Sequence, residues 1–124
     1  MGKYLKLNDI SSYKKAFILS NYVWKIVDDW DFLAKKTIGA QYLDAIDSIS
    51  ALIAEGFGRF SKKDKINFYR MSRGSTLECL DWTQKAYIRK LMTKSEYEHI
   101  MSNLKSMPLE INQLIKFTNL KLKE

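Results

Sequence analysis

Few residues in this chain have the types and spacing that could perform acid–base or metal chemistry. The sequence contains one histidine, His99, and one cysteine, Cys79, which together cannot supply the ligands of a structural zinc site. Glu96 lies three residues before His99, but a di-iron bundle needs this Glu-x-x-His spacing on two helices, and it occurs on one here. We therefore expect His99 on a helix surface and Cys79 as an ordinary helix residue rather than a nucleophile.

Glu55 and Glu78 are the remaining candidates for chemistry. Paired carboxylates can transfer protons or bind a metal ion. No second set of ligands accompanies these two, so we expect them to pair with Arg73 or to cap a buried polar network. The sequence thus predicts no catalytic residue, no metal site, no cofactor and no enzymatic activity.

Positive charge is concentrated in one part of the chain, which has 124 residues and a net charge of +7. Residues 61–94 carry 9 basic and 3 acidic side chains (9 − 3 = +6), whereas residues 1–60 carry +1 and residues 95–124 carry 0. A surface with this excess attracts a polyanion, and nucleic acid is the obvious candidate. A solvated helix face without a ligand is the alternative. The predicted nucleic-acid-binding residues are Arg59, Lys62, Lys63, Lys65, Arg70, Arg73, Lys85, Arg89 and Lys90.

Two glycines, Gly56 and Gly58, precede Arg59 and Ser61 at the start of this basic region. We expect Gly58 to adopt a left-handed backbone conformation that ends one helix, and Ser61 to cap the next. A helix N-terminus with lysines beside it can hold a phosphate. A helix stop and a cap with no ligand explain the same residues, and this second reading is the simpler one.

The elements that must position these residues are helices, because apolar residues recur every three or four positions nearly throughout. In the first helix this stripe comprises Ala16, Leu19, Val23, Ile26, Val27 and Trp30. The pattern predicts one domain over residues 1–124, an all-α antiparallel up-down-up-down four-helix bundle with helices at about 12–29, 33–56, 62–91 and 95–121. Pro108 falls inside the fourth helix, where it predicts a kink or a short break near residues 105–107.

Tyr13, Phe17 and Trp24 form a second apolar face on the first helix, at spacings of four and seven and away from the main stripe. Such a face needs a partner, so we predict that it is an oligomer interface. The alternative is that these aromatic side chains widen the core face.

The composition is that of a globular domain, with 46% hydrophobic and 28% charged residues. A single cysteine excludes an internal disulfide framework, so a reducing cytoplasm is the expected location. No apolar run exceeds roughly five residues, far fewer than the roughly 20 that cross a bilayer, so we expect no membrane span.

Several sequence blocks between Ala16 and Leu91, in one order, resemble a known family. That family is the four-helix-bundle proteins first noticed as reading frames in intervening sequences of bacterial 23S ribosomal RNA genes, which includes accessory variability proteins of diversity-generating retroelements. The matching blocks are Ala16-Phe17 through Val23-Trp24, Trp30-Asp31, Thr37-Ile38-Gly39 with Gln41, Asp47 to Arg59, Lys63-Asp64 with Phe68-Tyr69, and Arg73-Gly74-Ser75 with Glu78.

This resemblance implies a bundle that assembles into a homopentameric ring, without enzymatic activity. It also implies RNA, and a protein such as a reverse transcriptase, as partners. One departure is Asp44, which stands where relatives commonly have a basic residue. The function expected is a non-catalytic nucleic-acid-binding accessory or scaffold protein, with RNA favoured. The alternative is a structural or protein-interaction ring that binds no nucleic acid.

Overall fold

The protein is a four-helix bundle in this computed structural model, which describes residues 6–121. The long helices are α1 (Ser11–Asp28), α3 (Ala40–Phe57), α4 (Lys62–Ile88) and α5 (Lys94–Lys121). Short elements are η1 (Leu7–Asp9), before α1, and α2 (Phe32–Ala34) and η2 (Lys35–Gly39), which lead without a break into α3. Within the described residues there is no strand, and no helix is long and apolar enough to span a membrane.

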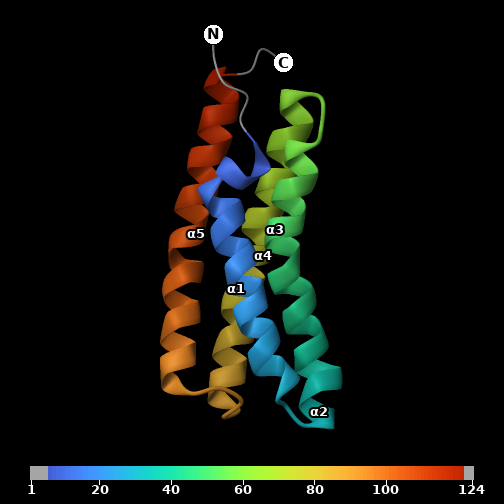
Figure 1. Cartoon of the computed structure of the whole chain (residues 1–124), viewed down its shortest axis with the longest axis vertical. Coiled ribbons are helices and arrows are strands. Elements are labelled where there is room, and N and C mark those ends of the chain that lie inside the picture. The colour runs from blue at the N-terminus through green and yellow to red at the C-terminus, as the bar shows by residue number, and fades with distance from the viewer. Residues whose placement is uncertain (1–5, 122–124) are drawn as a thin grey trace.

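The four long helices lie side by side, each running along the long axis of the molecule (Figure 1). α1 packs against α3 and α5, and α4 packs against the same two helices, so each helix has two neighbours. The α1–α3 side and the α4–α5 side are therefore opposite sides of the bundle.

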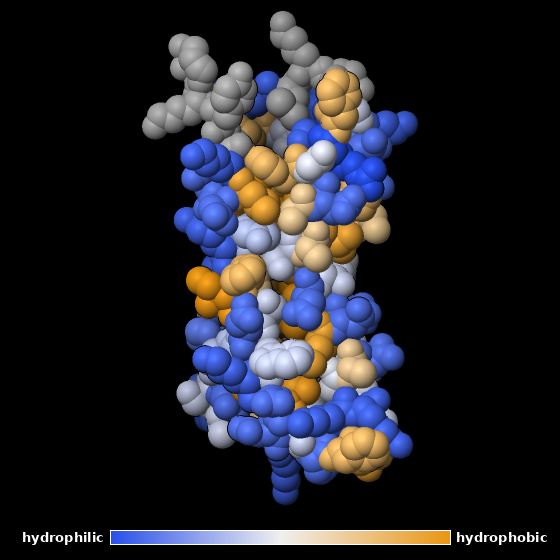
Figure 2. All heavy atoms as spheres, turned by 45° about the vertical axis from the view of Figure 1, so that its right-hand side comes forward, coloured by the Kyte–Doolittle hydropathy of each residue, from blue (hydrophilic) through white to orange (hydrophobic). Residues whose placement is uncertain are grey.

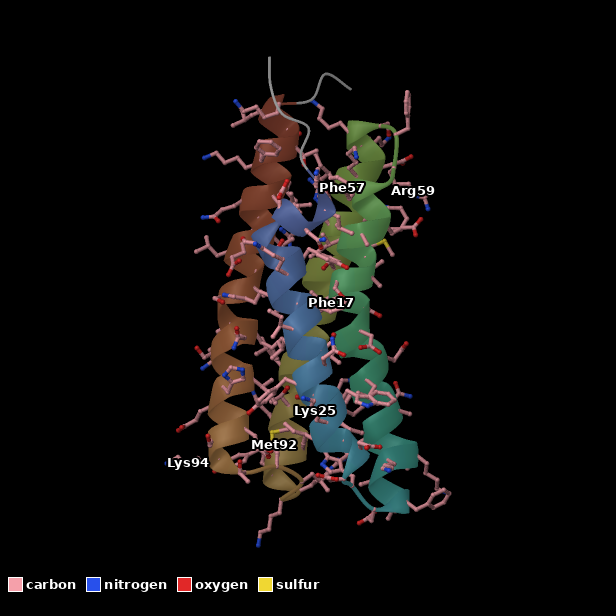
Figure 3. All side chains as sticks on the ribbon, viewed as in Figure 1. Phe17, Lys25, Phe57, Arg59, Met92 and Lys94 are labelled. Atoms are coloured by element: carbon pink, nitrogen blue, oxygen red, sulfur yellow. The ribbon has the colours of Figure 1, made fainter. Side chains whose placement is uncertain are left out.

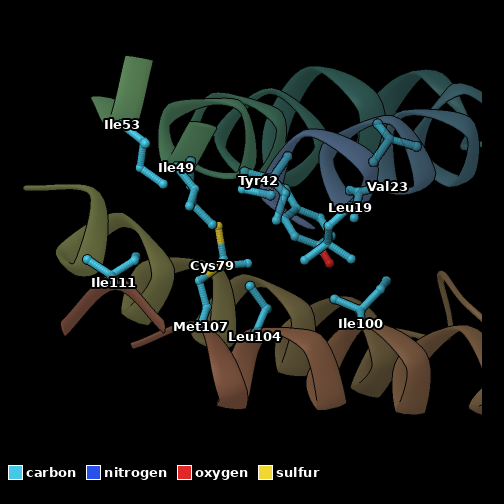
Figure 4. Close-up of a cluster of buried hydrophobic side chains, with 14 of the residues drawn as sticks. Leu19, Val23, Tyr42, Ile49, Ile53, Cys79, Ile100, Leu104, Met107 and Ile111 are labelled. Atoms are coloured by element: carbon cyan, nitrogen blue, oxygen red, sulfur yellow. The ribbon is translucent and has the colours of Figure 1, made fainter. Parts of the chain in front are cut away.

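Burial of the apolar stripes explains why these segments form helices that pack together. The stripe predicted for the first helix is buried along its whole length, and α3, α4 and α5 each bury a row of side chains of their own. Side chains from all four helices form one core cluster, in which Cys79 lies near Ile49 and Leu104, and Leu19 lies beside Tyr42 (Figure 4). Each fully buried aliphatic side chain of this size contributes about 1.5–3 kcal/mol to folding.

Helix ends are set by local hydrogen bonds that the sequence partly predicts. The Ser61 hydroxyl accepts the Asp64 N–H at 3.1 Å and caps α4 as expected. At the start of α5, Thr93 and Glu96 form a reciprocal capping box, with bonds of 2.8 and 3.1 Å. Glu96 thus has a structural role at a helix end.

The prediction of a left-handed Gly58 is wrong. Gly58 has φ −80° and ψ −7°, an ordinary right-handed conformation, and its N–H reaches the Ala54 carbonyl at 3.1 Å. The left-handed residue is instead Lys90, with φ 61°, at the end of α4. The Lys90 and Leu91 N–H groups bond back to the carbonyls of Tyr87 and Ala86, which is the hydrogen-bond pattern of a Schellman stop.

The predicted break near Pro108 is also absent, because α5 is continuous from Lys94 to Lys121. Met107, beside the proline, is fully buried in the core, and this packing keeps the segment helical although proline provides no N–H. A bend in the axis at Pro108 stays a prediction. The helix predicted at about 33–56 corresponds to the continuous run of α2, η2 and α3 from Phe32 to Phe57, and α4, predicted to end at 91, ends at Ile88.

Candidate nucleic-acid interface

The predicted cations do not form one continuous patch, because α4 separates them along its length. A helix of this length spans roughly 40 Å at about 1.5 Å per residue. Arg59 at the α3–α4 turn and Lys94 at the start of α5 mark opposite ends of the bundle (Figure 3). The nine residues fall into three groups: Arg59, Lys62, Lys63 and Lys65 at the α3–α4 turn; Arg70 and Arg73 in the first half of α4; and Lys85, Arg89 and Lys90 at its far end.

Two of the four cations at the α3–α4 turn are occupied by other groups of the protein. The Arg59 guanidinium pairs with the Glu55 carboxylate at 2.6 Å and lies 4.5 Å from the centre of the Phe68 ring. The Lys65 ammonium donates to the Phe57 carbonyl at 2.6 Å, and burial lowers its pKa. These contacts hold the turn closed and leave Arg59 and Lys65 less available to a ligand.

The sequence suggested that the N-terminus of α4 could bind a phosphate, and the hydrogen bonds at this turn test that suggestion. The Ser61 hydroxyl already accepts a hydrogen bond from the Asp64 N–H, and the Lys65 ammonium donates one to the Phe57 carbonyl. The turn is thus satisfied by protein groups, which favours the reading without a ligand at the glycines.

Lys62 and Lys63 are the cations that remain at this end. Lys62 is half-buried and its ammonium lies 3.5 Å from the Asn119 carbonyl, which places the end of α5 beside the start of α4. Lys63 is exposed and forms no ion pair within residues 6–121. Lys116 and Lys121, also exposed, lie on the last turns of α5, so four lysines gather at this end.

Phe60 completes this group and was missed by the sequence reasoning. Its side chain is 100% exposed in the turn between Arg59 and Lys62. Phe60 could have been found from the sequence, because it is an aromatic residue among basic residues in the turn between two helices. An aromatic face can stack on a base while nearby cations contact phosphates. We call Phe60, Lys62 and Lys63 the turn cluster.

The cations at the far end of α4 are partly neutralised. Lys85 pairs with Asp81 at 2.7 Å and lies over the Trp82 ring. Lys90 lines a shared surface hollow with Asp29, Asp31 and Glu96. Arg89 is the member of this group that is exposed and has no acidic contact within residues 6–121, so this end is a weaker polyanion surface than the turn cluster.

The middle group also differs from the expectation. The Arg73 guanidinium donates to the Asn112 side-chain carbonyl of α5 rather than to a carboxylate. The predicted pairing of Arg73 with Glu55 or Glu78 is therefore wrong, since Glu55 bonds Arg59 and Glu78 accepts the Trp82 indole N–H at 3.1 Å. Both carboxylates are exposed, so neither caps a buried polar network.

The two residues considered for nucleophilic or metal chemistry have structural surroundings. Cys79 is fully buried, and desolvation raises the pKa of its thiol far above the range in which a thiolate forms. His99 is exposed, as expected, and its ring lies 4.5 Å from the Tyr22 ring. Within residues 6–121 no three His, Cys, Asp or Glu side chains group as metal ligands.

The aromatic residues predicted at an oligomer interface lie outside the core. Phe17 and Trp24 are 50% and 54% exposed, and Tyr13 is half-buried with its ring 6.0 Å from that of Phe17. The alternative that these aromatic side chains widen the core therefore fits Tyr13, which is partly buried against the core, but does not fit the exposed Phe17 and Trp24.

The fold and surface define a class, namely small helical-bundle proteins with a basic turn between two helices. Comparison with known proteins assigns the chain more closely. The sequence model described as "23S rRNA-intervening sequence protein" matches residues 8–113, so the chain belongs to this family.

A solved structure supports the fold. It is the crystal structure of a protein of unknown function from the S23 ribosomal protein family of Bacteroides thetaiotaomicron, with a TM-score of 0.74 and 20% identity. The match covers 85% of this chain and 98% of that one. A search of curated proteins finds no match.

Proposed function

We propose that this protein is a non-catalytic nucleic-acid-binding accessory or scaffold protein that acts as a homo-oligomeric ring, with RNA as the favoured ligand. The turn cluster carries the proposal, because it combines a fully exposed aromatic ring with two adjacent lysines at the end of the bundle. The family description, which refers to 23S ribosomal RNA, supports RNA as the first ligand to test.

Single-stranded nucleic acid fits this geometry better than a duplex. An exposed ring can stack on an unpaired base, while lysines beside it contact phosphates without reading the sequence. In a ring, the cluster would repeat once per copy around one rim, and the repeated lysines would add to the attraction for a polyanion.

The test is a salt series of binding curves, measured by fluorescence anisotropy with labelled single-stranded RNA, single-stranded DNA and duplex RNA. The double variant Lys62→Gln/Lys63→Gln should flatten the log–log salt dependence for single strands by about 0.7 per lost phosphate contact. Phe60→Ala should weaken single-strand binding by about 1–3 kcal/mol without changing that slope.

The matched control is Lys25→Gln/Lys94→Gln, which removes the same charge from exposed lysines away from the α3–α4 turn (Figure 3). Its slope should equal that of the wild type. If the wild-type protein binds none of the three ligands at low salt, or if both double variants reduce the slope equally, the turn cluster is not a binding site. The first outcome would favour a structural ring that binds no nucleic acid.

A further inference from the structure

The α1–α3 side of the bundle carries aromatic and acidic residues that find no partner within the described chain. The exposed positions of α3 recur at spacings of four and three and share one side of that helix: Ala40, Asp44, Asp47 and Ala51. Trp24 of α1 lies near Ala40, the first of these positions, because both line a surface hollow of about 140 Å3 whose other lining residues are Val27, Asp28, Lys35 and Leu43. Figure 2, with the α3 side turned forward, shows hydrophobic side chains reaching the surface between hydrophilic ones. We call Phe17, Trp24, Asp44 and Asp47 the acidic face.

The two carboxylates of the acidic face lack a cation. Neither Asp44 nor Asp47 forms an ion pair within residues 6–121, and the ammonium of Lys35, which lines the hollow, lies 3.7 Å from the Asp28 carboxylate. Partial burial, and secondarily the charge of Asp44, raises the pKa of Asp47. A cation brought to this face from outside would stabilise both carboxylates in their charged form.

The α4–α5 side, on the opposite side of the bundle, has the complementary character. Arg70, Arg73 and Leu77 share one side of α4, and the hydrogen bond from Arg73 to Asn112 brings that side next to α5. On α5 the matching positions are Lys105, Leu109, Asn112 and Lys116. Leu77 and Leu109 are 59% and 63% exposed, and none of the four cations forms an ion pair in the described chain. We call Arg70, Arg73, Leu77, Lys105 and Leu109 the basic face.

We propose that the acidic face of one copy binds the basic face of another, in a head-to-tail contact between identical chains. This inference rests on the homo-oligomer of the proposed function and specifies how its copies meet. A contact of either face with itself would bring Asp against Asp or Arg against Arg, and such like-charge contacts are unfavourable. The pairing of unlike faces puts the arginines near Asp44 and Asp47 and covers Phe17 and Trp24 with Leu77 and Leu109. Aromatic residues and arginine are the residue types enriched in protein interfaces.

The contact also divides the predicted nucleic-acid-binding residues into two sets. Arg70 and Arg73 belong to the interface between copies, whereas Lys62 and Lys63 stay free at the end of the bundle. Assembly and nucleic-acid binding are then separable by mutation, which a single basic patch would not allow.

The test uses two charge-reversal variants and light scattering at micromolar concentration. Asp44→Lys/Asp47→Lys makes both faces basic, and Arg70→Glu/Arg73→Glu makes both acidic. Light scattering should give each variant alone the monomer mass of 14.5 kDa, and should give the wild type a multiple of that mass. An equimolar mixture should associate again, because each variant supplies a face that the other can bind.

Several outcomes would overturn the head-to-tail contact. One is a wild-type mass of 14.5 kDa, which would also remove the ring from the proposed function. Others are dissociation by only one of the two variants, which would indicate a different surface, or a mixture that stays monomeric. Circular dichroism checks each fold, and Asp→Asn and Arg→Gln variants replace any that lose helicity. Lys62→Gln/Lys63→Gln should keep the wild-type mass, so loss of nucleic-acid binding with intact assembly would concern the turn cluster alone.

Discussion

The hydroxyl groups of Tyr42 and Thr83 lie 2.7 Å apart inside the bundle and join α3 to α4 by a fully buried hydrogen bond. Thr83 also donates to the Cys79 carbonyl of its own helix at 2.7 Å, so the Tyr42 hydroxyl is the donor of the bond between helices. Burial raises the pKa of Tyr42 well above its ordinary value, which keeps the phenol protonated and able to donate.

This relationship predicts an ordered series of stabilities. Tyr42→Phe removes one bond and should cost about 1 kcal/mol, whereas Thr83→Val strands a buried phenol hydroxyl and should cost about 1–3 kcal/mol. The double variant should cost less than the sum, because no polar group is then left unpaired. Urea unfolding of the four proteins measures the coupling, and strictly additive effects would contradict the bond.

The same substitution at two glycines should have opposite effects. A Cβ atom at Gly56 would lie 2.8 Å from Tyr69 and 3.0 Å from the Lys65 carbonyl, so Gly56→Ala should destabilise the bundle by about 1–3 kcal/mol. Gly74 sits on the exposed side of α4 with nothing within 4 Å, and Gly74→Ala should stabilise it by about 0.5–1 kcal/mol. Thermal unfolding followed by circular dichroism distinguishes the two, and equal shifts would refute the packing at Gly56.

The left-handed conformation of Lys90 predicts that glycine at this position stabilises the protein. Its φ of 61° costs a residue with a Cβ roughly 1–2 kcal/mol, so Lys90→Gly should raise the free energy of unfolding. Lys90→Ala, which keeps the Cβ and removes the same charge, is the control and should not raise it. If the alanine variant gains as much as the glycine variant, the cause is charge and not backbone strain.

The raised pKa of Asp47 predicts how the stability of the protein changes with pH. Its pKa is raised in the folded chain, so the stability it contributes is present at low pH and is lost as pH rises through the folded pKa. In the monomeric Arg70→Glu/Arg73→Glu background, Asp47→Asn should therefore raise the melting temperature near neutral pH and have little effect at more acidic pH. An unchanged melting temperature across the whole range would contradict the raised pKa.

In the wild-type background the same substitution should act in the other direction. An arginine from a second copy would stabilise the Asp47 carboxylate, so Asp47→Asn should shift light scattering towards smaller masses. Asp9→Asn, which removes a carboxylate near the N-terminus, is the control and should leave the mass unchanged.

Sequence reasoning was most accurate where a single periodic pattern decides the structure. The stripe from Ala16 to Trp30 is buried because a three- and four-residue spacing fixes one side of a helix independently of its neighbours. Ser61 was predictable as a cap for a similar reason, since its hydroxyl bonds an N–H three residues away.

Features that depend on contacts between distant segments were not predictable. The spacing of Gly56 and Gly58 suggested a left-handed stop, but Gly56 is a glycine because α4 approaches it closely, and Gly58 needs no positive φ. The cations of residues 59–90 are close in sequence and were expected to form one patch, but they lie along the whole length of α4 and are therefore far apart in space. Arg73 found Asn112, a partner 39 residues away that no local pattern indicates.

The placement of two complementary faces on opposite sides of one bundle has a consequence for solubility at high concentration. A head-to-tail contact can repeat without limit, and it closes only when the rotation between successive copies returns the last to the first. If the proposed contact forms, a change that alters this rotation, for example at Ala40 or Ala51, which flank the two carboxylates on the same side of α3, would turn a closed particle into a growing fibre. The small side chains of α3 would then set the boundary between a discrete assembly and polymerisation.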